Sequence, residues 1–169
     1  RRAKYILADL DSGETLVIHL GMSGRMTVQA DGKAAKKIGT YVHDIAEGLS
    51  KHDHVVFETD APARILFNDH RRFGLMDLLE TKTLEADKLF RDIGIEPLSP
   101  GFNVKHLIAA LDGKKTPIKS ALLDQRVVAG LGNIYVAEAL FRSRISPKRL
   151  AGSLKADEIK KLVPAIKKV

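Results

Sequence analysis

The chain has 169 residues, of which 44% are hydrophobic and 29% are charged, enough for one large or two small domains with a real core. No apolar run approaches the 18 residues of a membrane helix, and because Arg1-Arg2 leads straight into a strand pattern we expect no signal peptide. The chain has no cysteine, which excludes disulfides and thiolate metal sites within it and is compatible with a reducing cytoplasm.

The formal net charge of +7 is concentrated at the C-terminal end. Residues 142–169 carry nine Lys and Arg against two acidic residues, a difference of seven, whereas residues 1–141 carry 19 of each and balance. A basic end suits a polyanionic partner, although a solvated helix face is the commoner meaning of a charge run alone.

Residues 1–80 predict a β domain, because short runs rich in Val, Ile and Leu alternate along them. The predicted strands are 3–10, 14–20, 25–29, 53–59, 63–68 and 73–79. The short links Asp11-Ser12-Gly13 and Asp60-Ala61-Pro62 are predicted turns, and they favour an antiparallel sandwich or barrel. The polar segment 30–50 is predicted to be a long loop with one helical turn near residues 43–47.

From Leu84 the apolar period becomes helical, and a helix is predicted through Ile93, ending at Gly94. The segment 96–101 contains two prolines, which suppress helix, so it is predicted to be a linker. The predicted domains are therefore residues 1–95 and residues 96–169.

Two more helices are predicted in the second domain. Asn103 is the expected N-cap of the first, which ends at Gly113, and Ser153 is the expected N-cap of the last. The residues expected to face inward are Val104, Leu107, Ile108 and Leu111 in the first and Ile159, Leu162, Val163 and Ile166 in the last. Pro164 is expected to kink or shorten the last helix.

The central stretch, residues 117–141, predicts two helices joined by two turns. A short helix, Ile118 to Leu123, is followed by a polar turn, an extended run at Val127-Val128 and the glycine turn Gly130-Leu131-Gly132. Asn133 is the expected N-cap of the second helix, and the apolar residues expected on one face of it are Ile134, Ala137 and Phe141, with Leu140 beside them. Unpaired N–H groups at such a helix start suit a phosphate. A plain helical hairpin is an equal alternative from the pattern alone.

Two loops of the β domain carry side chains suited to nucleic acid. Met22 stands between glycines in His19–Gly24, where an apolar wedge could fill a gap in a base stack; the alternative is that it folds back onto the sheet. Arg71 and Phe73 are two residues apart and point the same way in extended backbone, an arrangement suited to hydrogen bonding and stacking. The alternative is a hairpin loop whose Phe73 belongs to the core.

These stretches resemble a known family. PIKSALLDQ and AGLGNIYVAEALF resemble the helix–two-turns–helix motif of the formamidopyrimidine-DNA glycosylase and endonuclease VIII family, and HLGMSG and D-x-R-R-F-G resemble its β domain. The resemblance implies an α+β fold, with an antiparallel β-sandwich domain followed by a helical domain. The trio of methionine, arginine and phenylalanine favours the formamidopyrimidine branch.

The resemblance also implies roles for individual residues. Met22, Arg71 and Phe73 would fill the void behind an everted 8-oxoguanine, with Arg71 pairing to the orphaned cytosine. Lys4 would bind phosphate beside the lesion and take part in β-elimination, which makes it the candidate catalytic residue. The residues implied to contact DNA are His52, Arg71, Lys114, Lys119 and Asn133, while His54 is expected to be structural. We also expect Lys4, Lys119 and Asn133 to share one face.

The implied function is DNA base excision repair. A bifunctional glycosylase and AP lyase would flip an oxidised purine out of damaged double-stranded DNA and cleave the backbone through a Schiff base. The implied enzyme is a monomer without membrane contact, in the bacterial cytoplasm at the nucleoid. The alternatives are a non-catalytic nucleic-acid-binding module and a basic scaffold protein that binds no nucleic acid.

Three features depart from the family pattern. His70 stands where the family usually has proline, which is expected to loosen the loop. The segment P-E-L-P-E-V-E, which supplies the proline nucleophile and a glutamate, has no counterpart among the 169 residues, and neither does the four-cysteine zinc finger. We therefore expect no metal or other cofactor in this chain. From these 169 residues alone we expect weak DNA binding and at most slow nicking of abasic sites.

Overall fold

A computed structural model describes residues 1–30 and 50–169; the loop and helical turn predicted within residues 30–50 lie outside the described residues. The chain divides into two compact units. A helical unit comprises Arg1–Lys4, Asp11–Gly13 and Leu79–Val169, and a β unit comprises Tyr5–Leu10 and Glu14–Leu78. The domain boundary at residues 95 and 96 stays a prediction. Along the described ranges no helix is long and apolar enough to cross a membrane.

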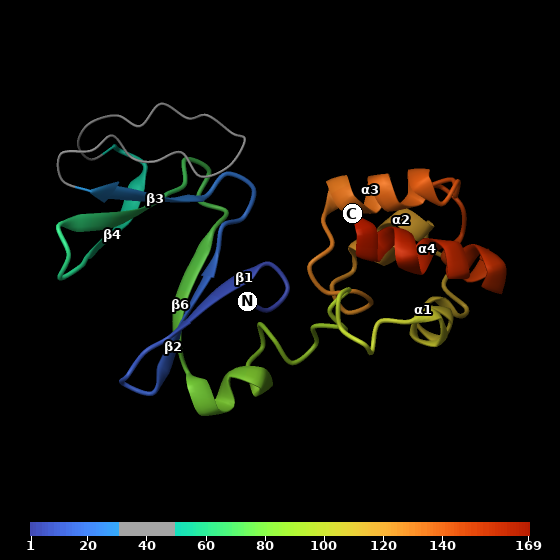
Figure 1. Cartoon of the computed structure of the whole chain (residues 1–169), viewed down its shortest axis with the longest axis horizontal. Helices are drawn as coiled ribbons and strands as arrows, with labels where there is room; N and C mark the ends of the chain where they lie inside the picture. The colour runs from blue at the N-terminus through green and yellow to red at the C-terminus, as the bar shows by residue number, and fades with distance from the viewer. Residues whose placement is uncertain (31–49) are drawn as a thin grey trace. The chain divides into compact units, whose positions relative to one another are not determined.

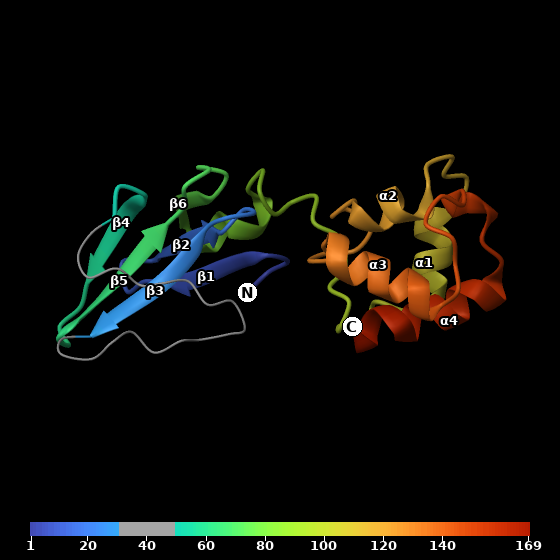
Figure 2. The same ribbon diagram turned by 90° about the horizontal axis from the view of Figure 1, so that it is seen from above.

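The predicted α+β fold is confirmed, with all six predicted strands present and their ends within two residues of the expected positions. The strands are β1 (Tyr5–Asp9), β2 (Glu14–His19), β3 (Arg25–Ala30), β4 (Asp53–Glu58), β5 (Ala63–Asn68) and β6 (Leu75–Glu80). They form two three-stranded sheets, in the orders β1-β2-β6 and β3-β5-β4, and Figure 2 shows β3 beside β5.

Antiparallel pairing sets the register of neighbouring strands in each sheet. Tyr5 lies opposite His19 across β1 and β2, and Arg25 lies opposite Asn68 across β3 and β5. The predicted turn between β1 and β2 is confirmed, since the Leu10 N–H donates to the Glu14 carbonyl at 2.8 Å. Among the described residues of this unit, the buried apolar side chains include Val17, Ile18, Leu66 and Phe67.

The helix predicted from Leu84 to Ile93 is wrong. A 3-10 helix, η1 (Thr81–Ala86), is followed by turns. Leu84 and Phe90 are both buried, yet six residues advance an α-helix by about 240°, so a regular helix could not bury both on one face. Gly94 is not a helix cap: its N–H donates to the Gln125 carbonyl at 2.8 Å, and an added Cβ would clash with the Arg126 carbonyl.

Besides η1, the helical unit contains four α-helices and a second short 3-10 helix, all within residues 104–168 (Figure 1). They are α1 (Val104–Leu111), α2 (Ile118–Leu123), α3 (Asn133–Arg142), η2 (Ala151–Ser153) and α4 (Ala156–Lys168). The predicted cap of α1 is confirmed, because the Asn103 side chain accepts the His106 N–H at 3.0 Å. In α1 Leu107 and Leu111 are buried, whereas Ile108 is exposed, so the inward face is narrower than predicted.

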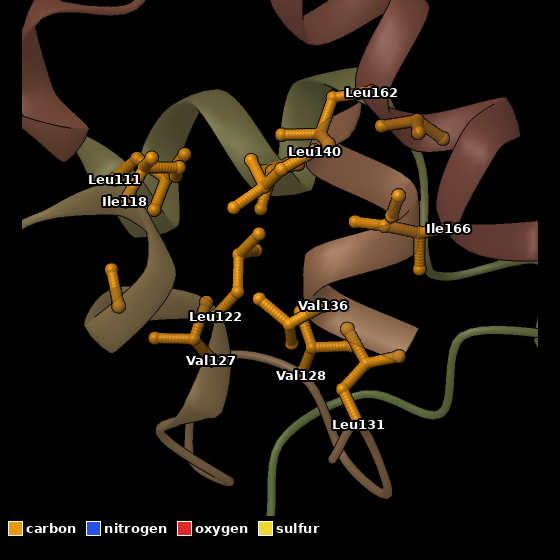
Figure 3. Close-up of a cluster of buried hydrophobic side chains, with 14 of the residues drawn as sticks. Leu111, Ile118, Leu122, Val127, Val128, Leu131, Val136, Leu140, Leu162 and Ile166 are labelled. Atoms are coloured by element: carbon orange, nitrogen blue, oxygen red, sulfur yellow. The ribbon is translucent and has the colours of Figure 1, made fainter. Parts of the chain in front are cut away.

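Aliphatic side chains from all four α-helices make one continuous core (Figure 3). The labelled side chains Leu122, Val136, Leu140, Leu162 and Ile166 point toward its centre. Burying a side chain of this size stabilises the fold by roughly 1.5–3 kcal/mol. This core therefore fixes the ends of α2 and α3, between which the two turns of the motif run.

The apolar face expected on α3 from Ile134, Ala137 and Phe141 is not the face that is buried. Val136, Ala139 and Leu140 are buried, whereas Ile134 is 68% and Phe141 is 81% exposed. Apolar residues run around most of this helix, so periodicity offers more than one stripe. Packing against α2 and α4 selects the stripe that contains Leu140.

The predictions for α4 are partly confirmed. Its buried residues are Ile159, Leu162, Val163 and Ile166, as expected. Ser153 is not its N-cap, because Ser153 lies in η2 and its hydroxyl donates to the Leu150 carbonyl at 2.8 Å. The Glu158 carboxylate instead accepts the Lys155 N–H at 2.8 Å. Pro164 does not shorten α4, which continues to Lys168 because residues beyond the proline still bury apolar surface.

Candidate nucleic-acid interface

The predicted helix–two-turns–helix is confirmed between α2 and α3. The first turn folds around Asp124, whose carboxylate accepts both the Arg126 backbone N–H at 3.0 Å and the Arg126 guanidinium at 2.9 Å. The hydrogen bond from the Arg126 side chain holds the pKa of Asp124 below its ordinary value. Val128 then forms a parallel bridge with Ile95, which confirms a brief extended segment at Val128.

One side chain joins the two turns. The Gln125 amide nitrogen donates to the Leu123 and Leu131 carbonyls, each at 3.0 Å, while its oxygen accepts the Gly130 N–H at 2.8 Å. Three hydrogen bonds from one amide fix the glycine turn to the end of α2. The sequence analysis treated Gln125 only as part of a polar turn, and no periodic signal distinguishes it.

Asn133 is not the N-cap of α3. Gly132 occupies that position with extended backbone, no side-chain cap is made there, and Asn133 is the first helical residue. Its side chain is exposed. A glycine at the cap lets the backbone approach closely and shifts the asparagine amide outward, where it can meet a ligand at the N-terminal end of the helix.

The N-terminal residues lie against this glycine turn. Ala3 is buried with φ +50°, and the Cβ position of Gly130 lies 3.5 Å from the Ala3 Cα. The Glu96 carboxylate accepts the Ala3 N–H, and Arg2 donates to the Ile93 and Gly94 carbonyls at 3.1 Å each. This clamp fixes the backbone that leads into residue 4.

Lys4 lies in a turn before β1, so its predicted place on a strand is wrong. The left-handed backbone of Ala3 ends any strand pairing there, and the side chain of Lys4 is exposed. Because Ala3 packs on Gly130, Lys4 follows directly after the contact with the glycine turn.

The two other predicted lysines of the helical unit are both half-buried. Lys114 follows α1, and its carbonyl accepts the Gly152 N–H at 2.9 Å. Lys119 is the second residue of α2, and its N–H donates to the Pro147 carbonyl at 3.3 Å. That Lys119, Asn133 and Lys4 share one face stays a prediction.

In the β unit, Met22 and Phe73 project into solvent. Met22 is 78% and Phe73 is 58% exposed, so neither folds back into the core. The two loops are in backbone contact, because Gly21 has φ +63° and an added Cβ would lie 2.6 Å from the Phe73 carbonyl oxygen. The Arg71 guanidinium lies over the Phe73 ring, 4.5 Å from its centroid. The structure thus brings the predicted trio of Met22, Arg71 and Phe73 onto adjoining loops.

Contrary to the prediction from the sequence, Arg71 and Phe73 are not on the same side of extended backbone. The segment is a turn rather than extended backbone: the Arg72 N–H donates to the Asp69 carbonyl at 3.3 Å, and Arg72 has φ +56°. Arg71 and Phe73 meet through a cation–π contact, which at exposed sites contributes about 0.5–1 kcal/mol.

A buried carboxylate holds both loops. Asp69 is 1% exposed; it accepts the Ser23 hydroxyl at 2.5 Å, the Gly74 N–H at 2.7 Å and the Arg71 N–H at 3.3 Å. The Ser23 hydrogen bond, followed by the backbone donors, lowers the pKa of Asp69 despite the opposing effect of burial. Sequence analysis did not single out Asp69; an acidic residue at the end of an apolar strand was the available signal.

Three histidines, His52, His54 and His70, lie around this loop, and His54 has the structural contact expected of it. The His54 ring lies 2.8 Å from the Asp69 carbonyl oxygen through Nε2, which supports a structural interpretation. His52 is half-buried, and its carbonyl accepts the Asp69 N–H at 3.0 Å. Its ring stands beside that of His70, with centroids 6.2 Å apart. Within residues 1–30 and 50–169, no three His, Cys, Asp or Glu side chains gather as a metal would require.

Two three-stranded antiparallel sheets and a helix–two-turns–helix motif define the class of this protein. It is a helix–two-turns–helix protein with an antiparallel β domain. Residues 1–76 match the formamidopyrimidine-DNA glycosylase N-terminal domain, and residues 93–169 match the formamidopyrimidine-DNA glycosylase H2TH domain. The chain belongs to the formamidopyrimidine-DNA glycosylase family.

Relatives and solved structures agree with this assignment. Formamidopyrimidine-DNA glycosylases of a Ruegeria and a Jannaschia species are 57% and 58% identical over all 169 residues, which span 58% of the length of each. The Lactococcus lactis enzyme, in a crystal structure with DNA containing an abasic site, has a TM-score of 0.85 at 29% identity, over 99% of this chain and 59% of that one. The crystal structure of the Thermus thermophilus protein has a TM-score of 0.81 at 33% identity, over 99% of this chain and 56% of that one.

Proposed function

We propose that the chain carries the lesion-recognition loops and the phosphate-binding motif of a DNA glycosylase and AP lyase that removes oxidised purines during base excision repair. Damaged double-stranded DNA is the partner, and the site of action is the bacterial cytoplasm at the nucleoid. The proposal is supported by the family and by relatives described as bound to DNA with an abasic site or a formamidopyrimidine lesion.

One observation carries it: three exposed side chains on two loops that contact each other through backbone. Exposing Met22 and Phe73 costs the β unit apolar burial, which a fold tolerates when the surface has a partner. Arg71 contributes a planar donor stacked on the Phe73 ring. In a duplex with a flipped base, Met22 and Phe73 fill the vacated stack while Arg71 donates to the orphaned cytosine.

The helical unit supplies the backbone contacts. The exposed Asn133 at the start of α3 and the side chains of Lys114 and Lys119 bind phosphates, which set orientation without reading sequence. Lys4 binds the phosphate beside the lesion and assists β-elimination. His52 contributes a contact from the β unit. We assign a cofactor-binding role to none of these residues.

The test is equilibrium binding of the 169-residue chain to three duplexes at one salt concentration: undamaged, abasic analogue opposite cytosine, and abasic analogue opposite adenine. We expect the abasic duplex with cytosine to bind tightest, and Phe73→Ala to remove most of that preference while leaving undamaged duplex unaffected. Leu98→Ala, at an exposed apolar residue outside the loops, is the matched control. Equal affinity for all three duplexes would leave a general nucleic-acid-binding module as the better description.

A further inference from the structure

The loop that carries Arg71 also contributes to a second cluster of basic side chains. We call Lys51, His52, His70 and Arg72 the histidine cluster. The rings of His52 and His70 meet edge to face with centroids 6.2 Å apart, His70 is exposed and His52 is half-buried. Lys51 precedes His52, Arg72 follows two residues after His70, and the charges of both act on His52.

The neighbouring carboxylates are engaged elsewhere. Asp53 accepts the Asn68 amide at 2.7 Å and the Ser50 N–H at 2.6 Å. Asp69 is buried and bonded to Ser23 and to two backbone N–H groups of its own loop. Among the described residues, the charged or titratable groups acting on His52 are Lys51, His70, His54 and Arg72, all basic.

These surroundings affect the charge of His52. Burial lowers the pKa of His52 below its ordinary value, and repulsion from Lys51, His70, His54 and Arg72 lowers it further. A ligand with negative charge placed against the cluster would cancel that repulsion and favour the imidazolium form. An anion held by this ring pair would therefore bind more strongly when His52 is protonated.

We propose that His52 and His70 together bind one DNA backbone phosphate, taking up a proton as they do so. The inference rests on the proposed function, since it assumes that DNA reaches this loop. A protonated imidazole donates from both ring nitrogens, and two rings 6.2 Å apart can donate to different oxygens of one phosphate. The His70 side chain can donate a hydrogen bond to a phosphate, whereas a proline at this loop position could not. The proposed contact therefore depends on this chain having histidine there.

The sign of the pH dependence follows. A group whose pKa is lowered in the free protein and raised by the phosphate binds protons on complex formation. Affinity for DNA therefore rises as pH falls through the histidine range, from about 7 to about 5.5, and levels off beyond it. One linked proton changes affinity by at most about tenfold per pH unit. Asp69 does not contribute, because its pKa lies below the ordinary carboxylate value.

The experiment measures affinity for the abasic duplex between pH 5.5 and 8 at constant ionic strength. Proton uptake is obtained by calorimetry in two phosphate-free buffers with different ionisation enthalpies. We expect uptake by the parent chain, and a clear reduction in both His52→Gln and His70→Gln. His106→Gln is the matched control, since that ring bonds the Val127 carbonyl in the helical unit, and its uptake should equal the parent's.

Uptake by His70→Gln equal to that of the parent would overturn the proposal. Histidine resonances of the parent, titrated with and without DNA, test it independently of whether the variants fold; unshifted His52 and His70 titrations would overturn it too. The two proposals fail separately. Equal affinity for abasic and undamaged duplexes at every pH would overturn lesion recognition, whereas proton uptake tests only the phosphate contact.

Discussion

The helical unit and the β unit hold their candidate DNA-binding side chains by different physical means. In the helical unit a continuous aliphatic core fixes α2, α3 and α4, and the exposed Asn133 is placed by the ends of these helices. In the part of the β unit that the structure describes, few large apolar side chains are fully buried, and a buried carboxylate, Asp69, joins the two loops that carry Met22 and Phe73.

The difference shows what each surface requires. A phosphate contact needs backbone and amide groups at fixed positions, which a dry, close-packed core provides. A wedge that enters a base stack must project far into solvent, where little apolar packing reaches it. Hydrogen bonds from several loop donors to one buried acceptor can hold such a projection, because they act on the loop backbone beneath the exposed side chains.

The largest expected effect separates the core from the surface of α3. Leu140→Ala should reduce the free energy of unfolding by about 2–5 kcal/mol, because Leu140 is 1% exposed within the core. Phe141→Ala, at the next residue and 81% exposed, should change it by less than about 0.5 kcal/mol. Chemical denaturation of both variants measures this. A larger loss for Phe141→Ala would restore the face predicted from periodicity.

The bond network of the two turns comes next. Gln125→Leu keeps the approximate size but removes three hydrogen bonds, leaving carbonyl and N–H groups unpaired at about 1–3 kcal/mol for a buried group. We expect lower stability and weaker binding to both damaged and undamaged DNA. Gln29→Leu in β3 is a control outside the motif. Unchanged DNA affinity would show that the turns keep their shape without Gln125.

The trio of Met22, Arg71 and Phe73 should affect the selectivity of DNA binding rather than its overall affinity. Arg71→Ala should reduce the preference for cytosine opposite the abasic site by roughly 1–3 kcal/mol, the contribution of a good base contact. Competition binding with cytosine and adenine opposite the site measures it. Arg64→Ala, on an exposed strand residue of the same unit, should leave the preference as it was. If Arg71→Ala retained the preference, the loop would have no base-reading role.

Phosphate contacts of the helical unit should act uniformly. Lys114→Ala should reduce the slope of log affinity against log salt by about one unit, and Asn133→Ala should weaken abasic and undamaged duplexes alike without changing the slope. Salt titrations of both variants give the answer. An Asn133→Ala chain that lost only abasic binding would place that residue with the wedge instead.

The smallest expected effect is local to the loop and comes from the ionisation of Asp69. A lowered pKa means that ionised Asp69 stabilises the fold above the ordinary carboxylate pKa of about 4, and that this contribution is lost as pH falls through the lower native value. The amide signals of Arg71 and Gly74 should therefore lose their dispersion in acid at a pH below 4. Asp69→Asn should show disorder of these amides already at pH 7. Ordered amides in that variant would show that the carboxylate charge is dispensable.

The sequence by itself determined the strands, most of the helices and their order. Short runs rich in Val, Ile and Leu placed all six strands, and the Asn103 cap and α2 followed from local chemistry that needs no distant partner. These features depend on residues within a few positions of one another, so local pattern suffices. The glycine neighbours of Met22 left two alternatives open, an exposed wedge or a side chain folded back on the sheet, and the structure decided for exposure.

Only the tertiary structure decided which apolar stripe of α3 is buried, whether residues 84–93 form a helix, and what holds the loops. The buried face of α3 depends on α2 and α4, and the turns after η1 depend on burying both Leu84 and Phe90. Ser23 and Asp69 are 46 residues apart, yet share a hydrogen bond. Such contacts are set by packing between distant segments, and no local periodicity encodes them.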